Sequence, residues 1–377
     1  MNFDLNEEQT MLKDSVSRFV QQQYDFEARN KAIANELGFD ADNWSTFAEL
    51  GWLSVPFAEE LGGFGGSIVD TMVVMEELGR GLVAEPYVAT VLLFGGLLAA
   101  SDNPQREALI GQIIEGSLQG AFAYHEKQSR YALNDVMTTA EKQGDGWQLN
   151  GEKTVVFNGM AADKLIVSAR TSGQQSDDTG ISLFLIDADA DGVARSSFRM
   201  MDGQIVANIT LNNVSVASDA LIGVEGAALP LMQDAINTAM VARSAEAQGI
   251  MEKLLNTTVE YTKTRKQFGV AIGSFQALQH RMVDMFTASE QHRSLLYRAV
   301  CAINEGSDSV DKDRHALKVM TGRSGKLIGD EAIQLHGGMG ITDELDVGHF
   351  VKRLMMINSA FGDADYHQQA FAKLIAA

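Results

Sequence analysis

The sequence is poor in cysteine, proline and positive charge. Its single cysteine, Cys301, cannot form a disulfide within the chain. Four prolines in 377 residues leave room for long helices. Lysine and arginine together number 30 against 50 aspartates and glutamates, which gives a formal net charge of −20. Nucleic acids and anionic membrane surfaces attract basic proteins, so neither is expected as the main partner.

The sequence also lacks long apolar runs. No stretch approaches the about 20 apolar residues of a membrane-spanning helix, and no cleavable signal is recognisable. The most apolar run, Val88 to Ala100, is too short to span a bilayer and predicts a buried helix. We therefore expect no membrane span and a cytoplasmic protein. The seven histidines show no paired metal-ligand spacing, so no metal site is expected either.

The apolar residues that are present show helical spacing at both ends of the chain. A hydrophobic content of 45% can form a sizeable core, and the length predicts two or three domains. Leu5, Met11, Leu12, Val16 and Val20 predict an amphipathic helix near the N-terminus. A glycine-rich stretch, 62–66, precedes a second apolar helix at 68–81, and it lacks the strand and the lysine of a nucleotide-binding loop.

The middle of the chain has a different pattern, in which short runs alternate between apolar and polar residues. These runs predict strands at 120–125, 136–142, 146–156, 163–170, 181–187 and 204–216. Polar connections are expected at 172–180 and 187–193, and the second lacks the glutamate of a calcium loop. Helical spacing returns from Pro230. We therefore predict an α+β chain with a helical domain at 1–118, a β-domain at 119–228 and helices at 229–377.

A positive side chain and a turn follow the first C-terminal helix. Apolar residues at helical spacing end near Tyr261 and begin again at Leu278, which places Arg265 at a helix end. Gly269 and Gly273 allow the chain to reverse there. An arginine fork beside backbone N–H groups suits a phosphate or pyrophosphate oxygen. The alternative is a solvated arginine beside two turn glycines.

Three segments in this order carry a resemblance: RKQFG at 265–269, FQALQH at 275–280 and QLHGGMGIT at 334–342. Together they resemble the C-terminal half of the acyl-CoA dehydrogenase flavoproteins. The segment LGWLSVPFAEELGGFGGS, 50–67, resembles that family's entry into its second helical segment, so the resemblance covers nearly the whole chain. It implies a β-barrel-like central domain, a C-terminal four-helix bundle and FAD as cofactor. It also implies an acyl-CoA substrate and an electron-transfer flavoprotein that reoxidises the flavin.

The resemblance further implies which residues contact FAD, on two sides of the cofactor. On the adenine and pyrophosphate side these are Arg265, Gln267, Phe268, Gln276, Gln334, Leu335, Gly337 and Gly338. The segment 334–338 is expected to act across a subunit boundary, where its glycines let the backbone approach a ligand closely. On the side of the flavin ring they are Val155 and Phe157.

The ring-facing motifs depart from the family pattern. Where the family has roughly T-E-P-x-x-G-S-D, this chain has His125, Glu126 and Lys127 with no GSD after them. Where the family has W-I-T-N-G, this chain has VVFNG, 155–159. Phe157 therefore replaces a hydroxyl, and an aromatic ring can cover the flavin but cannot donate that hydrogen bond.

The catalytic base is a third departure. Removal of the α-proton of a thioester needs a carboxylate, whose pKa rises in a desolvated pocket. The family's usual Y-E-G-T aligns with FGDAD, 361–365, so Gly362 stands at the place of the glutamate. The second glutamate position known in the family falls near 239–240, where there is no carboxylate. Asp363 is our candidate base, with Asp365 and Glu246 as alternatives. The two aspartates could instead only cap a helix that runs to Ile375.

The sequence thus predicts an FAD-dependent acyl-CoA dehydrogenase that desaturates an acyl-CoA between its α and β carbons. It is most similar to the small subunits of the bacterial pimeloyl-CoA dehydrogenase type. Because the adenine-side motifs are intact and the ring-side motifs have changed, we predict a mixed oligomer with a second acyl-CoA dehydrogenase chain, with a homo-oligomer as the alternative. Two copies of each chain and fewer flavins than subunits are expected. A non-catalytic subunit that completes FAD binding for another chain, and a flavin oxidase or monooxygenase, remain as alternatives.

Overall fold

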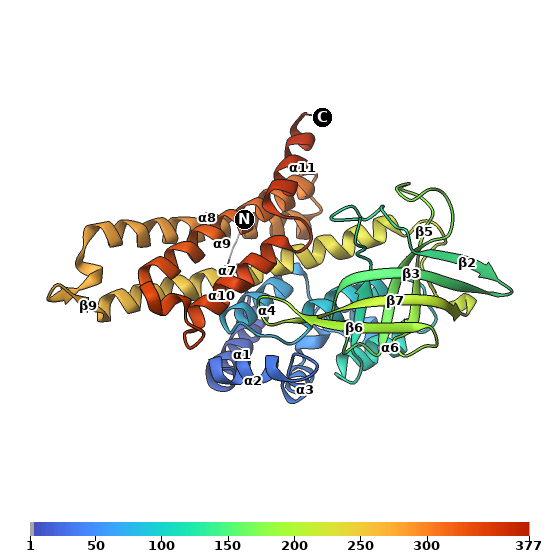
Figure 1. Cartoon of the computed structure of the whole chain (residues 1–377), viewed down its shortest axis with the longest axis horizontal. Helices are drawn as coiled ribbons and strands as arrows, with labels where there is room; N and C mark the ends of the chain where they lie inside the picture. The colour runs from blue at the N-terminus through green and yellow to red at the C-terminus, as the bar shows by residue number, and fades with distance from the viewer. Residues whose placement is uncertain (1–3, 377) are drawn as a thin grey trace. The chain divides into compact units, whose positions relative to one another are not determined.

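The computed structural model describes residues 4–376, which form two compact units (Figure 1). The helical unit comprises the described part of Met1–Asn30, Ser67–Val83 and Met240–Ala377. The sheet unit comprises Lys31–Gly66 and Ala84–Ala239. The α+β class predicted from the sequence is confirmed. Within the described residues, no helix is both long and apolar enough to cross a membrane.

The helical unit is a bundle built on long helices. Its elements are α1 (Glu7–Gln23), the start of α2 (Phe26–Ala34), α4 (Ile68–Arg80), most of α7 (Leu229–Thr264), α8 (Gln276–Glu305), α9 (Val310–His336), α10 (Asp346–Ser359) and α11 (Ala364–Ala376). The core draws on α7, α8, α9 and α10 through residues such as Ile250, Met285, Ile328 and Leu354. The predicted C-terminal four-helix bundle is thereby confirmed.

Local sequence explains where α4 begins and how closely α4 and α7 pack. Ser67 and Asp70 form a capping box at the start of α4, so the first N–H groups of that helix have side-chain partners. A Cβ on Gly79 would lie 2.2 Å from the carbonyl oxygen of Glu246, and one on Gly249 would lie 1.9 Å from that of Glu76. Glycine at these two positions therefore lets the backbones of α4 and α7 come into contact.

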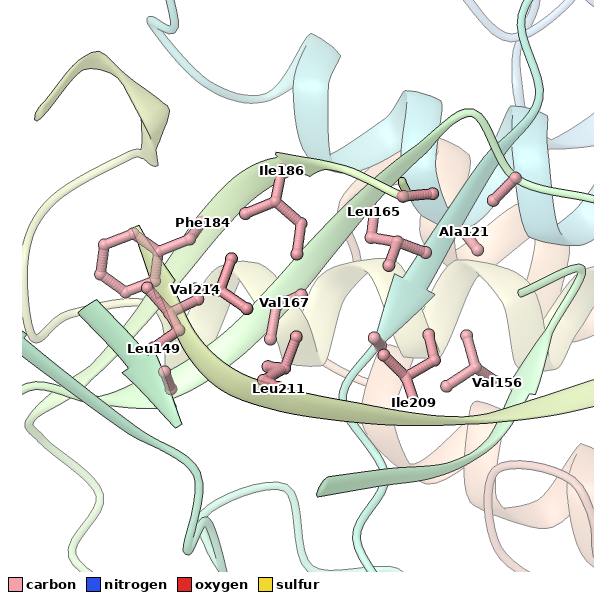
Figure 2. Packing of buried hydrophobic residues seen from close by; sticks show 14 of the residues in the cluster. Ala121, Leu149, Val156, Leu165, Val167, Phe184, Ile186, Ile209, Leu211 and Val214 are labelled. Atoms are coloured by element: carbon pink, nitrogen blue, oxygen red, sulfur yellow. The ribbon is translucent and has the colours of Figure 1, made fainter. Parts of the chain in front are cut away.

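The sheet unit holds an 8-stranded sheet in the order β6-β7-β3-β2-β4-β5-β8, with β1 paired to β4. The strands are β1 (Gly120–Ala123), β2 (Thr139–Gln143), β3 (Gly146–Phe157), β4 (Lys164–Arg170), β5 (Ile181–Asp187), β6 (Val193–Arg199), β7 (Ile205–Val216) and β8 (Leu221–Ile222). The β1–β4 and β2–β4 pairs are parallel, and the other pairs of this sheet are antiparallel. One face buries Leu149, Val167, Phe184 and Ile209 in a shared core (Figure 2).

Short helices complete the sheet unit. They are α3 (Ala41–Glu49), η1 (Trp52–Ser54), η2 (Glu59–Leu61), η3 (Val88–Gly95), α5 (Gly96–Ala99), α6 (Arg106–Ile114) and η4 (Ser218–Ala220). The apolar run at 88–100 is a buried helix as predicted, although its first part, η3, is a π-helix. A Cβ on Gly120 would lie 2.2 Å from the ring of Phe94, so this glycine lets β1 pack on η3.

The predicted strands are all present, but the sequence did not indicate β6. Its residues, VARSSFR, are mostly exposed. A strand with no buried face does not need apolar residues at every second position, so the alternation that predicts a strand is missing. The polar connection predicted at 187–193 shares its first residue with β5 and its last residue with β6. The connection predicted at 172–180 lies outside the strands.

Candidate functional site

The first part of the candidate site is the corner between α7 and α8 in the helical unit. The helix α7 ends at Thr264, and the Arg265 N–H donates to the carbonyl oxygen of Tyr261 at 2.8 Å. A small hairpin follows, made of β9 (Lys266–Gln267) and β10 (Val270–Ala271). Its tip is Phe268, with φ 54°, and the Phe268 side chain is 92% exposed. Arg265 and Gln267 are exposed as well, so this corner presents a cation and a ring to solvent.

The N-terminus of α8 lies beside this arginine-bearing helix end. The Ile272 N–H donates to the Arg265 carbonyl oxygen at 2.9 Å, and a Cβ on Gly273 would lie 3.0 Å from the carbonyl oxygen of Thr262. Phe275 occupies the N-cap position and provides no side-chain hydrogen bond to the first turn. A helix start without a side-chain cap offers N–H groups to an anion. Exposed Gln276 stands in this first turn.

The second part is the end of α9 and the short helix η6 (Gly337–Ile341). The Tyr261 ring packs on His336 with ring centroids 4.4 Å apart, so this end of α9 lies beside the end of α7. Gln334 is exposed, whereas Leu335 is 5% exposed and belongs to the bundle core. Gly337 has φ 62°, and apart from the adjacent residues no heavy atom of residues 4–376 would lie within 4 Å of a Cβ on Gly337 or Gly338. The backbone here is open to close approach by another molecule.

The third part is the turn between α10 and α11, where the family's glutamate was sought. Phe361 and Gly362 both have positive φ, 59° and 102°. A Cβ on Gly362 would lie 2.5 Å from Nε2 of His367 and 2.7 Å from Cδ1 of Tyr366. Both the backbone conformation and the space therefore exclude a glutamate at position 362 unless the turn rearranges.

The carboxylates near this turn differ in their contacts. Asp363 is the first residue before α11, and its Oδ1 accepts the Tyr366 N–H at 2.8 Å, which is an N-cap contact. Asp365 is exposed on the first turn of α11. Glu246 is buried and bonds Arg243 at 2.5 Å and Arg353 at 2.6 Å. Burial alone would raise the pKa of Glu246, but the two arginines hold it at about 2. Such a carboxylate is a poor proton acceptor near neutral pH.

The fourth part lies in the sheet unit, at the bulge of β3. The Thr154 N–H donates to the carbonyl oxygen of His125 at 2.8 Å, and His125 Nδ1 lies 3.0 Å from Thr154 Oγ1. Val155 has φ 53°, which is unfavourable for a β-branched residue, and its N–H donates to Asn208 Oδ1 at 3.3 Å. Phe157 is half-buried at the end of the strand. Local strain of this kind is found more often at ligand sites than elsewhere.

A buried ion pair holds the loop that precedes this bulge. Lys153 Nζ lies 2.7 Å from Glu126 Oε1, and both side chains are almost fully buried. Glu126 also accepts the N–H groups of Met137 at 2.8 Å and Thr138 at 3.1 Å. Burial raises the pKa of Glu126, but Lys153 and these hydrogen bonds lower it to about 2. Glu126 therefore stays ionised and fixes the loop from His125 to Thr138.

The structure thus places the predicted site residues in two groups. Arg265, Gln267, Phe268, Gln276, Gln334, Leu335, Gly337, Gly338 and Asp363 belong to the helical unit, whereas Val155 and Phe157 belong to the sheet unit. Lys153 and Lys318 were not singled out from the sequence, although both are buried. Lys153 could have been found, because it occupies an inward position of β3 between Leu149 and Val156. Nothing in the sequence distinguishes Lys318 from other helical lysines.

Comparison with known proteins accounts for nearly all of the chain. The sequence matches the N-terminal domain of acyl-CoA dehydrogenases over residues 6–117, the middle domain over 121–214 and the C-terminal domain over 229–375. It is 26% identical over 379 residues to the probable acyl-CoA dehydrogenase YngJ of Bacillus subtilis, covering 99% of both chains.

Solved structures give the same result. The chain resembles one in the ChsE4-ChsE5 complex from Mycobacterium tuberculosis, with a TM-score of 0.89 and 25% identity over 100% of this chain and 99% of that one. It also resembles PigA in its FAD complex, with a TM-score of 0.92 and 26% identity over 100% of this chain and 99% of that one. The chain therefore belongs to the acyl-CoA dehydrogenase family.

Proposed function

We propose that this chain is an FAD-binding subunit of an acyl-CoA dehydrogenase that introduces an α,β double bond into an acyl-CoA. We propose further that it resembles the small subunits of the bacterial pimeloyl-CoA dehydrogenase type and works in a hetero-oligomer with a second acyl-CoA dehydrogenase chain. One observation carries this proposal. The adenine-side corner at Arg265 is exposed, while a Cβ at position 362 would clash with the side chains of His367 and Tyr366.

The helical unit fits the pyrophosphate half of FAD. The exposed Arg265 guanidinium and the N-terminus of α8, which lacks a side-chain cap, provide positive charge and N–H donors at one corner. Gly337 and Gly338 leave the backbone open at the end of α9. Bound FAD would supply the hydride acceptor, and an electron-transfer flavoprotein would reoxidise it. The exposed Phe268 ring is suited to packing on the cofactor or on a partner chain.

The sheet unit fits the flavin ring through apolar side chains rather than through polar ones. Val155 and Phe157 flank the bulge of β3, and Phe157 can cover a ring without donating a hydrogen bond to it. His125 is directed to Thr154 by a hydrogen bond within the chain. These residues would shape one wall of a ring pocket and exclude water from it, while the polar contacts to the ring would come from backbone groups or from another chain.

Apolar side chains exposed on the helical unit support an oligomer. The exposed fraction is 58% for Val283 and 54% for Phe286, which lie on one face of α8. It is 74% for Ile341, which follows α9. Apolar residues that are adjacent on an exposed helix face, as Val283 and Phe286 are, can contribute to a surface that binds another protein. The ChsE4-ChsE5 complex, named for two components, is a precedent for a mixed assembly in this family.

For this chain's own chemistry we propose Asp363 as the base. It is the half-buried carboxylate closest in sequence to the glutamate position. Its cap contact to Tyr366 uses Oδ1, and a carboxylate oxygen has more than one acceptor position. The cap contact and the closed position 362 favour a second candidate function, in which the chain completes FAD binding and the partner supplies the glutamate. We keep the division at 1–118, 119–228 and 229–377 as the domain proposal.

Purification with and without a partner separates these functions. The chain is expressed alone and with a candidate acyl-CoA dehydrogenase chain, and native mass, FAD per chain, anaerobic bleaching by acyl-CoA and hydrogen peroxide are measured. A mixed oligomer with fewer flavins than subunits that bleaches without forming peroxide supports the proposal. A homo-oligomer with one FAD per chain and full desaturation would contradict the mixed assembly. Peroxide formation would indicate an oxidase.

A further inference from the structure

Two histidines meet beside the α10–α11 turn. Nδ1 of His315 on α9 lies 2.7 Å from Nδ1 of His367 on α11, and Nε2 of His367 lies 2.9 Å from the carbonyl oxygen of Phe361. His367 is 4% exposed. A carbonyl only accepts hydrogen bonds, so Nε2 of His367 carries a hydrogen and, in the neutral ring, Nδ1 of His367 is an acceptor. His315 must then donate from its own Nδ1.

The same turn has other fixed contacts, to α9 and between its own two ends. Lys318 Nζ donates to the carbonyl oxygens of Ile357 at 2.5 Å, Asn358 at 3.2 Å and Ala360 at 2.8 Å. The Ala364 N–H donates to Asn358 Oδ1 at 3.2 Å. The His367 ring occupies the space that a side chain at position 362 would need. The His367 ring therefore both bonds the turn and sets how closely α11 approaches it.

We propose that His315 and His367 form a positioning pair, which holds the Phe361–Asp363 turn through a hydrogen bond between two rings that share at most one extra proton. With one added proton, one Nδ1 still donates and the other still accepts. With two, both Nδ1 atoms carry hydrogens and repel, so the turn loses the contact to α9 that runs through His315. The inference concerns how the turn is held, so it stands whether or not Asp363 is the base.

Burial is the main factor that opposes protonation of the pair, and the neighbouring charges act in both directions. Burial lowers the pKa of His367 to about 4, and burial also lowers the pKa of His315. Lys318 acts in the same direction on His367, and Arg314 does so on His315, whereas Asp363 and Asp311 favour the charged rings. The Tyr366 ring packs on His367 with centroids 5.2 Å apart.

The sign of the pH dependence follows from these shifts. Unfolded histidines gain protons near pH 6.5, while the folded pair resists them until lower pH. The folded state therefore binds fewer protons between about pH 6.5 and pH 4, and the turn becomes less stable as the pH falls through that range. The stabilisation is complete above that window. Each withheld proton can change the opening equilibrium by up to about tenfold per pH unit.

The experiment measures hydrogen exchange of the full-length protein at residues 357–368, at pH 7.5 and pH 5.0, corrected for intrinsic exchange rates. In the wild type, protection of this segment should fall by roughly tenfold or more. His367→Gln keeps an N–H donor for the Phe361 carbonyl but cannot titrate, so its protection should be independent of pH. His280→Gln, at an exposed histidine on α8, is the matched control and should behave as the wild type.

Equal pH dependence in the wild type and in His367→Gln would overturn the proposal, as would an effect of His280→Gln on the segment. A second measurement needs no variant. Nitrogen NMR of histidine-labelled wild-type protein should show His315 protonated on Nδ1 and His367 on Nε2 at pH 7.5, with coupled titration of the two rings. The same tautomer on both rings, or independent titration near pH 6.5, would contradict the pair.

Discussion

The α10–α11 turn and the β9–β10 hairpin belong to the same unit and to the same candidate site, but they are held in opposite ways. The turn is fastened by Lys318, by His367 and by Asn358, all within the chain. The hairpin leaves Phe268 and Arg265 exposed, and its polar side chains make few contacts with the bundle.

Because of this difference, substitutions in the turn and in the hairpin should have different effects. The conformation of the turn is set by its contacts to α9, so changes to the residues that make or crowd these contacts should affect the free energy of unfolding first. The side chains of the hairpin gain contacts only from a ligand or another chain, so changes there should affect binding and leave folding unchanged. Four substitutions test this comparison, two on folding and two on function.

Lys318→Met should have the largest effect on folding. It removes an ammonium that serves three backbone carbonyls in a buried place and leaves them without this donor. If each loss costs about 1 kcal/mol, unfolding free energy should fall by about 3 kcal/mol or more. Denaturant unfolding measures this, with Lys326→Met as the control because Lys326 lies on the same helix and is exposed. A loss no larger than that of the control would show that the turn does not depend on Lys318.

Gly362→Glu should have the second largest effect on folding and should not create a catalytic base. Its backbone has φ 102°, and its Cβ would meet His367 at 2.5 Å. Strain and overpacking together should cost about 2–3 kcal/mol of stability, and anaerobic flavin reduction should not increase. Adding His367→Ala should recover part of the stability, because it removes the nearer of the two rings that clash, the other being Tyr366. A stable Gly362→Glu protein with faster reduction would mean that the turn adapts easily.

Asp363→Asn separates the two roles of this residue. Asparagine caps helices about as well as aspartate, so stability should change little. If Asp363 is the base, the rate of flavin reduction by acyl-CoA should fall by about 10²-fold, because an amide cannot accept the proton. Rapid-mixing reduction kinetics and a melting curve measure the two effects on one sample. An unchanged reduction rate would assign the base to the partner chain or to another carboxylate.

The sequence was sufficient to predict those elements of the fold that depend on a local residue pattern. The strands, the helix end at Arg265 and the buried run at 88–100 follow from periodicity and turn residues, and the structure contains them. It was insufficient where a contact joins distant segments. His315 and His367 are 52 residues apart, and nothing in either local sequence shows that the rings meet. Likewise β6 was missed because its exposed residues do not alternate.

Arg265→Ala should have the smallest effect, and it should appear in cofactor binding alone. The side chain is exposed at the end of α7, so the apo-protein should unfold at the same temperature as the wild type. If Arg265 bonds the FAD pyrophosphate, the lost charge-assisted hydrogen bond should cost about 1.5–3 kcal/mol, or roughly tenfold or more in affinity. FAD retained after dialysis and the dissociation constant measured by fluorescence report this, on the chain alone or on the mixed oligomer. Lys263→Ala is the control, since Lys263 is an exposed cation two residues away that pairs with Glu260. Equal FAD affinity in the two variants would remove Arg265 from the cofactor site and leave the hairpin as a surface for protein contact.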